Sequence, residues 1–228
     1  MRDSPPFDTF ALAASVSDLD REPDAREHAD LVEFRMDLAS EPLTALRAYD
    51  GDLPVLATNR VEREGGEAVA DERRLDDLVR ATRERAVVAV DVELSAVETG
   101  DGERVLSAAE EAGADTIVSV HDFERTPSRE QLRESLAAAA DHGTVGKVAV
   151  TAADAEDVLD LLAATRERTR AGDRLATMAM GEPGRHSRAV APLYGSRIGY
   201  APLDTAEATA PGQFDVATLA RVVETLRG

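Results

Sequence analysis

Short apolar runs rich in β-branched residues alternate with segments of helical spacing along almost the whole chain, and this alternation restricts the fold most. Strands that alternate with helices build parallel α/β sheets. No glycine-rich phosphate loop follows the first run, as an open dinucleotide-binding sheet would require. The sequence therefore predicts an α/β protein, a single-domain (β/α)8 TIM barrel over residues 1–228. The predicted strands are 11–16, 31–37, 55–60, 87–94, 116–123, 145–151, 175–181 and 197–203.

The intervening segments carry start and stop signals of helices. Ser128 and Asp154 are each followed three residues later by a polar partner, which is typical of N-terminal caps. Gly113 and Gly143 stand where two of these helices should end. The segments after the first two strands are short and weakly periodic. The predicted helices are 71–85, 102–112, 128–141, 154–169 and 215–227.

The chain is strongly acidic, with a formal net charge of −19 and a sequence pI of about 4.6. Such a molecule repels phosphate backbones and anionic lipids, so we expect no nucleic-acid or membrane partner. Acidic chains poor in lysine suit concentrated salt, where the Debye length falls to about 3 Å at 1 M. This composition favours a halophilic source, and the alternative is a genome that encodes arginine in place of lysine.

Several classes of protein are excluded by what the sequence lacks. It contains no cysteine, which excludes disulfides, thiolate metal sites and a cysteine nucleophile. No apolar run approaches the roughly 18 residues of a membrane span, and no charged-then-apolar leader follows Met1. We therefore expect a cytoplasmic protein.

One lysine, Lys147, stands against 25 arginines. It lies inside the apolar run Val145–Val150, although lysine is rarely buried without a partner. Arginine cannot replace lysine wherever a neutral amine is required. The retained lysine therefore indicates amine chemistry, with half of a buried ion pair as the plainer alternative.

Polar residues late in the predicted strands are the candidates for a site, because barrel enzymes place their active sites at the carboxyl ends of the strands. His121 follows the strand next to that of Lys147, which suggests an imine-forming amine beside a general acid/base. A structural histidine is the alternative, and Glu33 and Arg35 can simply pair with each other. Further candidates are Arg60, Asp91, Glu93, Ser119, Met178, Met180, Ser187, Arg188 and Gln213.

Seven motifs in order resemble those of the type I 3-dehydroquinate dehydratases, across nearly the whole chain. They are E-x-R (Glu33–Arg35), an arginine followed by E-G-G (Arg60, Glu64–Gly66), S-x-H-D-F (Ser119–Phe123), the Schiff-base lysine (Lys147), M-x-M-G (Met178–Gly181), G-x-x-S-R (Gly184–Arg188) and P-G-Q (Pro211–Gln213).

The resemblance implies a lyase of the shikimate pathway, and thus of aromatic amino acid biosynthesis, that dehydrates 3-dehydroquinate by syn elimination through a lysine imine. It implies Lys147 as the covalent residue, His121 as the acid/base and Glu64 as the residue that orients His121. It also implies a homodimer that uses neither a cofactor nor a metal. The implied substrate-binding residues are Ser15, Glu33, Arg35, Arg60, Met178, Met180, Ser187, Arg188, Thr209 and Gln213.

Two departures and three alternatives remain open. Thr209 replaces a frequent serine, and Pro202 occupies the place assigned to an aromatic residue of some members, which leaves the contacts over the substrate unsettled. The alternatives are a class I aldolase, a non-catalytic carboxylate-binding barrel, and a metal site of Glu33, Asp91 and His121. Asp91 and Glu93 are otherwise interpreted as supporting or barrel-rim residues.

Overall fold

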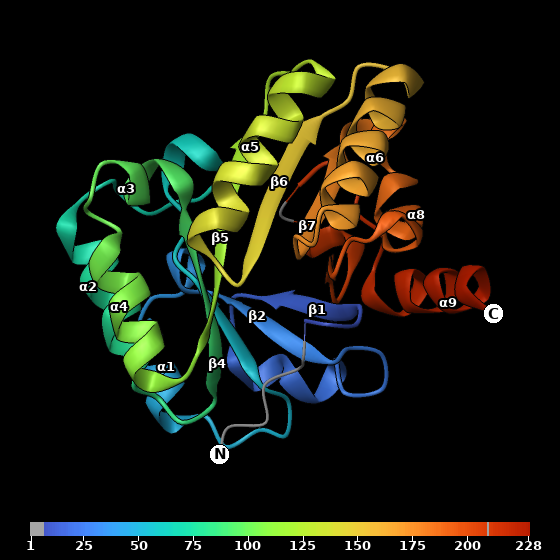
Figure 1. The fold of residues 1–228 in the computed structure, drawn as a ribbon. Coiled ribbons are helices and arrows are strands. Elements are labelled where there is room, and N and C mark those ends of the chain that lie inside the picture. Colours follow the sequence, from blue (N-terminus) through green and yellow to red (C-terminus); the bar gives the residue numbers. More distant parts are fainter. Residues whose placement is uncertain (1–6, 209) are drawn as a thin grey trace.

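The strands form one parallel sheet that curls into a nearly closed barrel with helices around it (Figure 1). The computed structural model describes residues 7–208 and 210–228. The sheet order is β7-β6-β5-β4-β3-β2-β1-β8, so the predicted α/β barrel is confirmed. The strands are β1 (Ala11–Val16), β2 (Leu31–Arg35), β3 (Val55–Thr58), β4 (Val87–Glu93), β5 (Asp115–Asp122), β6 (Val145–Thr151), β7 (Leu175–Met180) and β8 (Ile198–Pro202).

The helices begin and end largely where the cap residues predict. Ser128 forms a capping box with Gln131, Asp154 accepts two backbone N–H groups, and Gly113 ends its helix with φ 67°. After β1 the chain forms only a 3-10 turn, Leu19–Asp24, as the weak periodicity there indicates. The α-helices are α1 (Pro42–Ala48), α2 (Glu72–Ala81), α3 (Leu94–Glu98), α4 (Glu103–Ala112), α5 (Arg129–His142), α6 (Ala155–Arg170), α7 (Gly181–Gly184), α8 (Ser187–Tyr194) and α9 (Val216–Arg227).

The inside of the barrel changes character along its axis. Near the amino ends of the strands, apolar side chains fill it, among them Leu31, Leu56 and Ile117, each fully buried. Side chains of a strand face the interior at every second residue, so the next inward positions on the same strands are Glu33, Thr58 and Ser119. The interior is therefore an apolar floor below a polar layer at the carboxyl ends.

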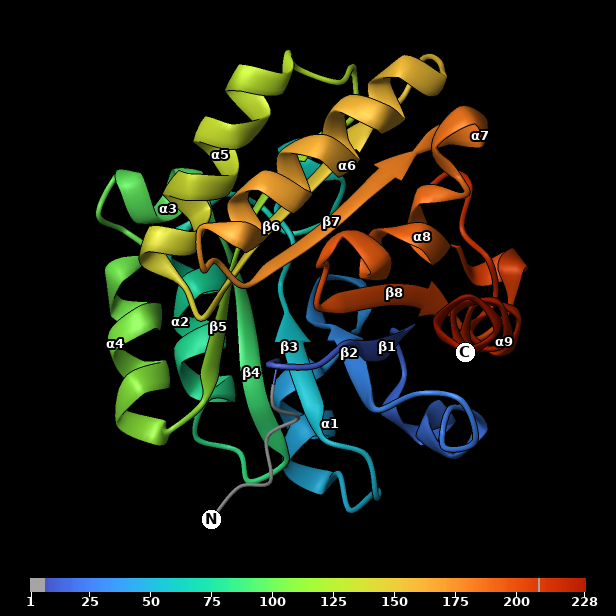
Figure 2. The same cartoon turned by 45° about the vertical axis from the view of Figure 1, so that its right-hand side comes forward.

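The barrel has one junction without a regular ladder in the part of the chain that the structure describes. β7 and β8 are joined by a single bridge, Leu175 to Ser196, at their amino ends. Figure 2 shows the two strands diverging toward their carboxyl ends. Helix α8, which carries Arg188, follows β7, and the loop that carries Gln213 follows β8, so both begin at this seam.

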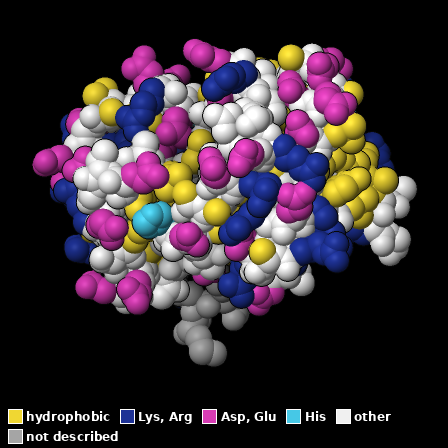
Figure 3. Space-filling view, turned by 45° about the horizontal axis from the view of Figure 1, so that its top comes forward, with side chains coloured by type: hydrophobic (Ala, Val, Ile, Leu, Met, Phe, Trp, Pro, Cys, Tyr) yellow, Lys and Arg dark blue, Asp and Glu magenta, His cyan; other side chains and the backbone are white. Residues whose placement is uncertain are grey.

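The outer surface matches the acidic composition. Aspartate and glutamate side chains are spread over the face in Figure 3, with arginines between them. Within residues 7–208 and 210–228, the structure contains no helix long and apolar enough to cross a membrane.

Candidate active site

A cavity at the carboxyl ends of the strands collects the predicted residues. The strand register produces this, because Ser15 pairs with Glu33, and Ser119 with Lys147, on neighbouring strands. The cavity is lined by Ser15, Glu33, Arg35, Thr58, Arg60, Glu64, Gly65, His121, Phe123, Lys147, Ala149, Met178, Met180, Arg188, Tyr200, Ala210 and Gln213.

Lys147 places its amine on the floor of this cavity with 6% of its side chain exposed. Its Nζ atom lies 3.0 Å from Oδ2 of Asp91 and 4.0 Å from Oε1 of Glu33. The ring of Tyr200 covers the same nitrogen, with its centroid 4.1 Å away. Two carboxylates and an aromatic face therefore surround the amine, although the lysine lies inside an apolar run of the sequence.

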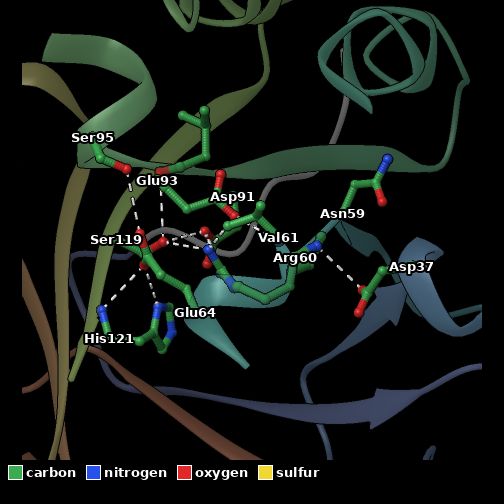
Figure 4. A network of polar contacts seen from close by, with 12 residues as sticks. Asp37, Asn59, Arg60, Val61, Glu64, Asp91, Glu93, Ser95, Ser119 and His121 are labelled. Atoms are coloured by element: carbon green, nitrogen blue, oxygen red, sulfur yellow. Dashed lines mark hydrogen bonds and ion pairs between the residues drawn. The ribbon is translucent and has the colours of Figure 1, made fainter. Parts of the chain in front are cut away.

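Below the amine, charges of opposite sign alternate in a buried chain (Figure 4). Arg60 donates to Asp91 (2.6 Å), to Glu93 (2.9 Å) and to the Ser119 hydroxyl (2.8 Å). Arg74 of α2 closes the other end with a contact of 2.8 Å to Glu93. Of the two interpretations from sequence, Asp91 and Glu93 are thus buried supporting residues and not barrel-rim residues, and both contact the guanidinium of Arg60.

His121 and Glu64 form a pair, shown in Figure 4, and both line the same cavity as Lys147. Oε2 of Glu64 lies 3.0 Å from Nδ1 of His121 and also accepts the backbone N–H of that residue. Burial raises the pKa of Glu64 to about 7, against the opposing charge of Arg60. Burial, aided by the charges of Arg60 and Lys147, lowers the pKa of His121 well below its ordinary value. The histidine is therefore neutral at neutral pH and able to accept a proton.

The two glycines after Glu64 are required by close approaches. Gly65 has φ 80°, and a Cβ atom there would lie 2.2 Å from the ring of Phe123. A Cβ atom on Gly66 would lie 1.9 Å from the carbonyl oxygen of Arg60. The E-G-G motif thus folds the loop tightly enough to bring Glu64 under His121.

Glu33 and Arg35 line the cavity but do not pair with each other. Glu33 accepts hydrogen bonds from Ser15 (2.6 Å) and Thr58 (3.1 Å). Arg35 forms a two-pronged pair with the buried carboxylate of Asp37, at 2.9 and 2.6 Å. Asp37 also accepts the backbone N–H of Arg60, so it joins Arg35 to the loop of Glu64. Asp37 was not among the site residues predicted from the sequence, although it stands two residues after Arg35.

Arg188 is a buried cation without an acidic neighbour. It is 5% exposed, and its Nε and Nη2 atoms have no hydrogen-bond partner within the described ranges 7–208 and 210–228. Burial lowers its pKa from 12.5 to about 10. Gln213 faces the same cavity and accepts the backbone N–H of Ala210. Thr209, the other predicted residue of this loop, lies outside the described residues.

The remaining candidates separate into two groups. Met178 and Met180 line the cavity, as does Tyr200, whose hydroxyl is buried. Ser187 does not line it, because its hydroxyl bonds the backbone of Ala179 instead. From β8, Tyr200 supplies an aromatic ring to the cavity, and Pro202 does not line it.

The metal alternative finds no support in the geometry. Among the residues that the structure describes, no group of three or more histidine, aspartate or glutamate side chains is placed to hold a metal ion. Instead, Asp91 is bound by Arg60, Lys147 and Ser119. Among the described residues, the cavity contains the amine of Lys147, the neutral imidazole of His121 and the guanidinium of Arg188, which pairs with no carboxylate there.

Comparisons with known proteins agree with this arrangement. A family model described as Type I 3-dehydroquinase matches residues 12–228. The 3-dehydroquinate dehydratases of the haloarchaea Haloarcula marismortui and Halobacterium salinarum are 55% and 51% identical over 224 residues. Each match covers 97% of this chain, with 98% and 99% of the relatives.

Solved structures give the same result. The 3-dehydroquinate dehydratase of Geobacillus kaustophilus has a TM-score of 0.83 at 32% identity, covering 95% of this chain and 91% of its own. The type I enzyme of Clostridium difficile, solved with covalent modified comenic acid, has a TM-score of 0.83 at 27% identity, with coverage of 96% and 92%. The chain belongs to the type I 3-dehydroquinase family.

Proposed function

We propose that Lys147 and His121 perform the reaction of this chain, which as a type I 3-dehydroquinase dehydrates 3-dehydroquinate to 3-dehydroshikimate in the shikimate pathway. Residues 1–228 act as one catalytic domain. The observation that carries the proposal is the position of the only lysine, whose Nζ atom lies in the same cavity as a histidine with a depressed pKa.

Lys147 supplies the electron sink. Its amine attacks the C3 ketone of the substrate, water leaves, and an iminium ion forms between Nζ and C3. The positive nitrogen then accepts the electron pair that is released when the C2 proton is removed. A guanidinium stays protonated and cannot attack, which explains why arginine does not replace lysine at this one position.

His121 moves the protons. It first accepts a proton from the ammonium of Lys147, and it returns this proton to the oxygen that leaves C3 as water. It then removes the C2 proton and gives it to the departing C1 hydroxyl on the same face, which is a syn elimination. Water finally hydrolyses the product iminium, which breaks the bond between Nζ and C3 and releases 3-dehydroshikimate and the amine of Lys147. Glu64, 3.0 Å from Nδ1, fixes the ring so that Nε2 faces the substrate.

The substrate carboxylate binds Arg188. This guanidinium is buried and pairs with no carboxylate among residues 7–208 and 210–228, whereas Arg35 pairs with Asp37 and Arg60 with Asp91. A carboxylate ligand satisfies both its charge and its unmade hydrogen bonds. Gln213 assists there, and Glu33 and Arg35 bind the ring hydroxyls.

The class I aldolase and the non-catalytic barrel are less consistent with these findings. The family match over residues 12–228 decides against the aldolase. A barrel that only binds a carboxylate has no need of a buried amine in the same cavity as a neutral histidine.

The test is reductive trapping. Borohydride added with 3-dehydroquinate should fix one adduct, and intact mass and peptide mapping should place it on Lys147, because the N-terminal amine is the only other primary amine in the chain. Lys147→Met should lose both trapping and turnover, and Lys147→Arg should restore neither. Turnover without trapping, or an adduct on the N-terminal amine, contradicts the proposal.

We further propose a homodimer, which the family resemblance implies. The exposed apolar side chains Leu193 and Tyr194 of α8 (48% and 38% exposed) are suited to such an interface. Light scattering at high salt should give twice the mass of the chain, and a monomer mass contradicts the dimer.

A further inference from the structure

We propose that Asp91 is the fixed counter-ion of the Lys147 nitrogen, a positioning residue that aims the amine at the substrate ketone and stabilises the iminium ion. This inference rests on the function proposed above. Asp91 does not line the cavity, so it touches the lysine and not the substrate. Asp91 has no part in the mechanism proposed above.

The geometry of β4, β5 and β6 brings the two residues together. Asp91 lies on β4 and Lys147 on β6, and β5 separates these strands. The Asp91 carboxylate accepts a hydrogen bond from Ser119 of β5, and its Oδ2 atom lies 3.0 Å from Nζ of Lys147. Both side chains are buried, at 0% and 6% exposure, so solvent does not screen the contact.

Three donors hold the carboxylate in place. Oδ1 accepts from Arg60 and from the Ser119 hydroxyl, each at 2.6 Å, which leaves Oδ2 for the lysine. Burial alone would raise the pKa of Asp91, but the charges of Arg60 and Lys147 outweigh burial and hold the pKa below its ordinary value. Asp91 therefore remains an anion and does not act as the base that takes the proton from the amine.

The charge on nitrogen explains why a permanent anion is useful. An ammonium ion and a ketone give an iminium ion and water, so two protons leave with the oxygen and one positive charge stays on nitrogen. The carbinolamine between them carries no charge on nitrogen. A fixed carboxylate at 3.0 Å thus favours the iminium over the neutral intermediate before it, in a site where the local dielectric is low.

Glu33 is the competing carboxylate, and the structure argues against it in this role. Its Oε1 atom lies 4.0 Å from Nζ, and its two oxygens already accept from Ser15 and Thr58. Glu33 also lines the cavity, where it is available to the substrate. Asp91 is nearer, more deeply buried and held by a cation.

The test separates covalent from non-covalent steps in Asp91→Asn. The rate of borohydride-trappable adduct formation at saturating 3-dehydroquinate should fall about 10- to 100-fold, the effect of losing one close opposite charge. The dissociation constant of quinate, which has a hydroxyl in place of the C3 ketone and forms no imine, should change by less than about threefold. A role confined to barrel stability would weaken both measurements together.

Two further variants complete the experiment. Asp173→Asn removes another carboxylate paired with an arginine, Arg168 at 2.7 Å, away from the cavity, and should leave both measurements unchanged. Ser119→Ala keeps the charge of Asp91 but removes one donor that positions it, so adduct formation should slow about 3- to 10-fold. If Asp91→Asn does not fold, Ser119→Ala decides.

Wild-type adduct formation in Asp91→Asn, or in Ser119→Ala where that variant decides, overturns the inference. So does a loss of quinate binding as large as the loss of adduct formation. Absence of a Lys147 adduct in the wild-type protein refutes instead the function on which the inference rests. If the wild type and Asp91→Asn are trapped at equal rates, that function stands and only the role of Asp91 fails.

Discussion

Replacing Arg188 with methionine should stabilise the free protein while it removes the binding of the substrate carboxylate. Arg188 is 5% exposed, and burial lowers its pKa from 12.5 in the unfolded chain to about 10. At about 1.4 kcal/mol per pKa unit, the folded protein holds this charge at a cost of about 3 kcal/mol. The cost applies at neutral pH, where the guanidinium is charged in both states, and it is relieved only as the pH rises above about 10.

Methionine keeps an unbranched stem and removes the charge, so the free energy of unfolding should rise by about 1 to 3 kcal/mol. Urea unfolding at fixed high salt and near neutral pH measures this. Arg168→Met is the matched control, because Arg168 pairs with Asp173 at 2.7 Å and is partly exposed. The control should gain nothing and lose up to about 1 kcal/mol.

In the same Arg188→Met variant, kcat/KM for 3-dehydroquinate should fall about 10²- to 10³-fold, since truncating one partner of a buried charge pair costs about 2 to 5 kcal/mol. A variant that is inactive but no more stable than the wild type refutes the view that this guanidinium waits unpaired for a ligand. A variant that is stabilised and fully active places the carboxylate elsewhere.

Three other substitutions test the neighbouring residues. His121→Ala should lower kcat about 10²- to 10⁴-fold and slow imine formation, yet borohydride should still trap the adduct on Lys147 after longer incubation, and near wild-type turnover contradicts the role in proton transfer. Glu64→Gln should raise the free energy of unfolding above pH 7 but not below pH 4.5, because the folded-state pKa of about 7 exceeds the ordinary 4.5 and the charged form is penalised only at high pH. Urea titrations at both pH values measure the difference, and a pH-independent effect refutes the cause given. Gly66→Ala should lower the free energy of unfolding by about 1 to 3 kcal/mol, since its Cβ atom meets the Arg60 carbonyl at 1.9 Å, and an unchanged value contradicts the tight loop.

Local sequence patterns predicted the barrel well because strands and caps are encoded locally. The predicted strands 11–16 and 145–151 coincide with β1 and β6, and the others differ at their ends by a few residues. The helix α8 was not predicted. It is short and contains Pro192, and its apolar face is recognisable only once β7 and α6 lie against it.

The site was predictable where strand ends alone decide, and not where side chains cross between strands. His121 and Glu33 follow from the rule that carboxyl ends of parallel strands meet, and Lys147 follows from being the only lysine, inside an apolar run. Asp91 reaches a partner two strands away, which no local pattern indicates. Ser187 stands next to Arg188 in the motif, but the helix turns its hydroxyl toward the backbone of Ala179.

The junction between β7 and β8 separates two sets of residues of the proposed site. From β3 to β6, every strand is hydrogen-bonded to its neighbours on both sides. This part of the barrel carries Glu64, Asp91, His121 and Lys147. Arg188 and Gln213 follow β7 and β8, the two strands on either side of the single-bridge junction. The residues proposed to make and break bonds thus lie on strands with continuous ladders, whereas the two residues proposed to hold the substrate carboxylate follow the strands at the junction. We expect the barrel to deform more easily at this junction, so that a substrate could enter or a product leave with little change in the distances between Lys147, His121 and Glu64.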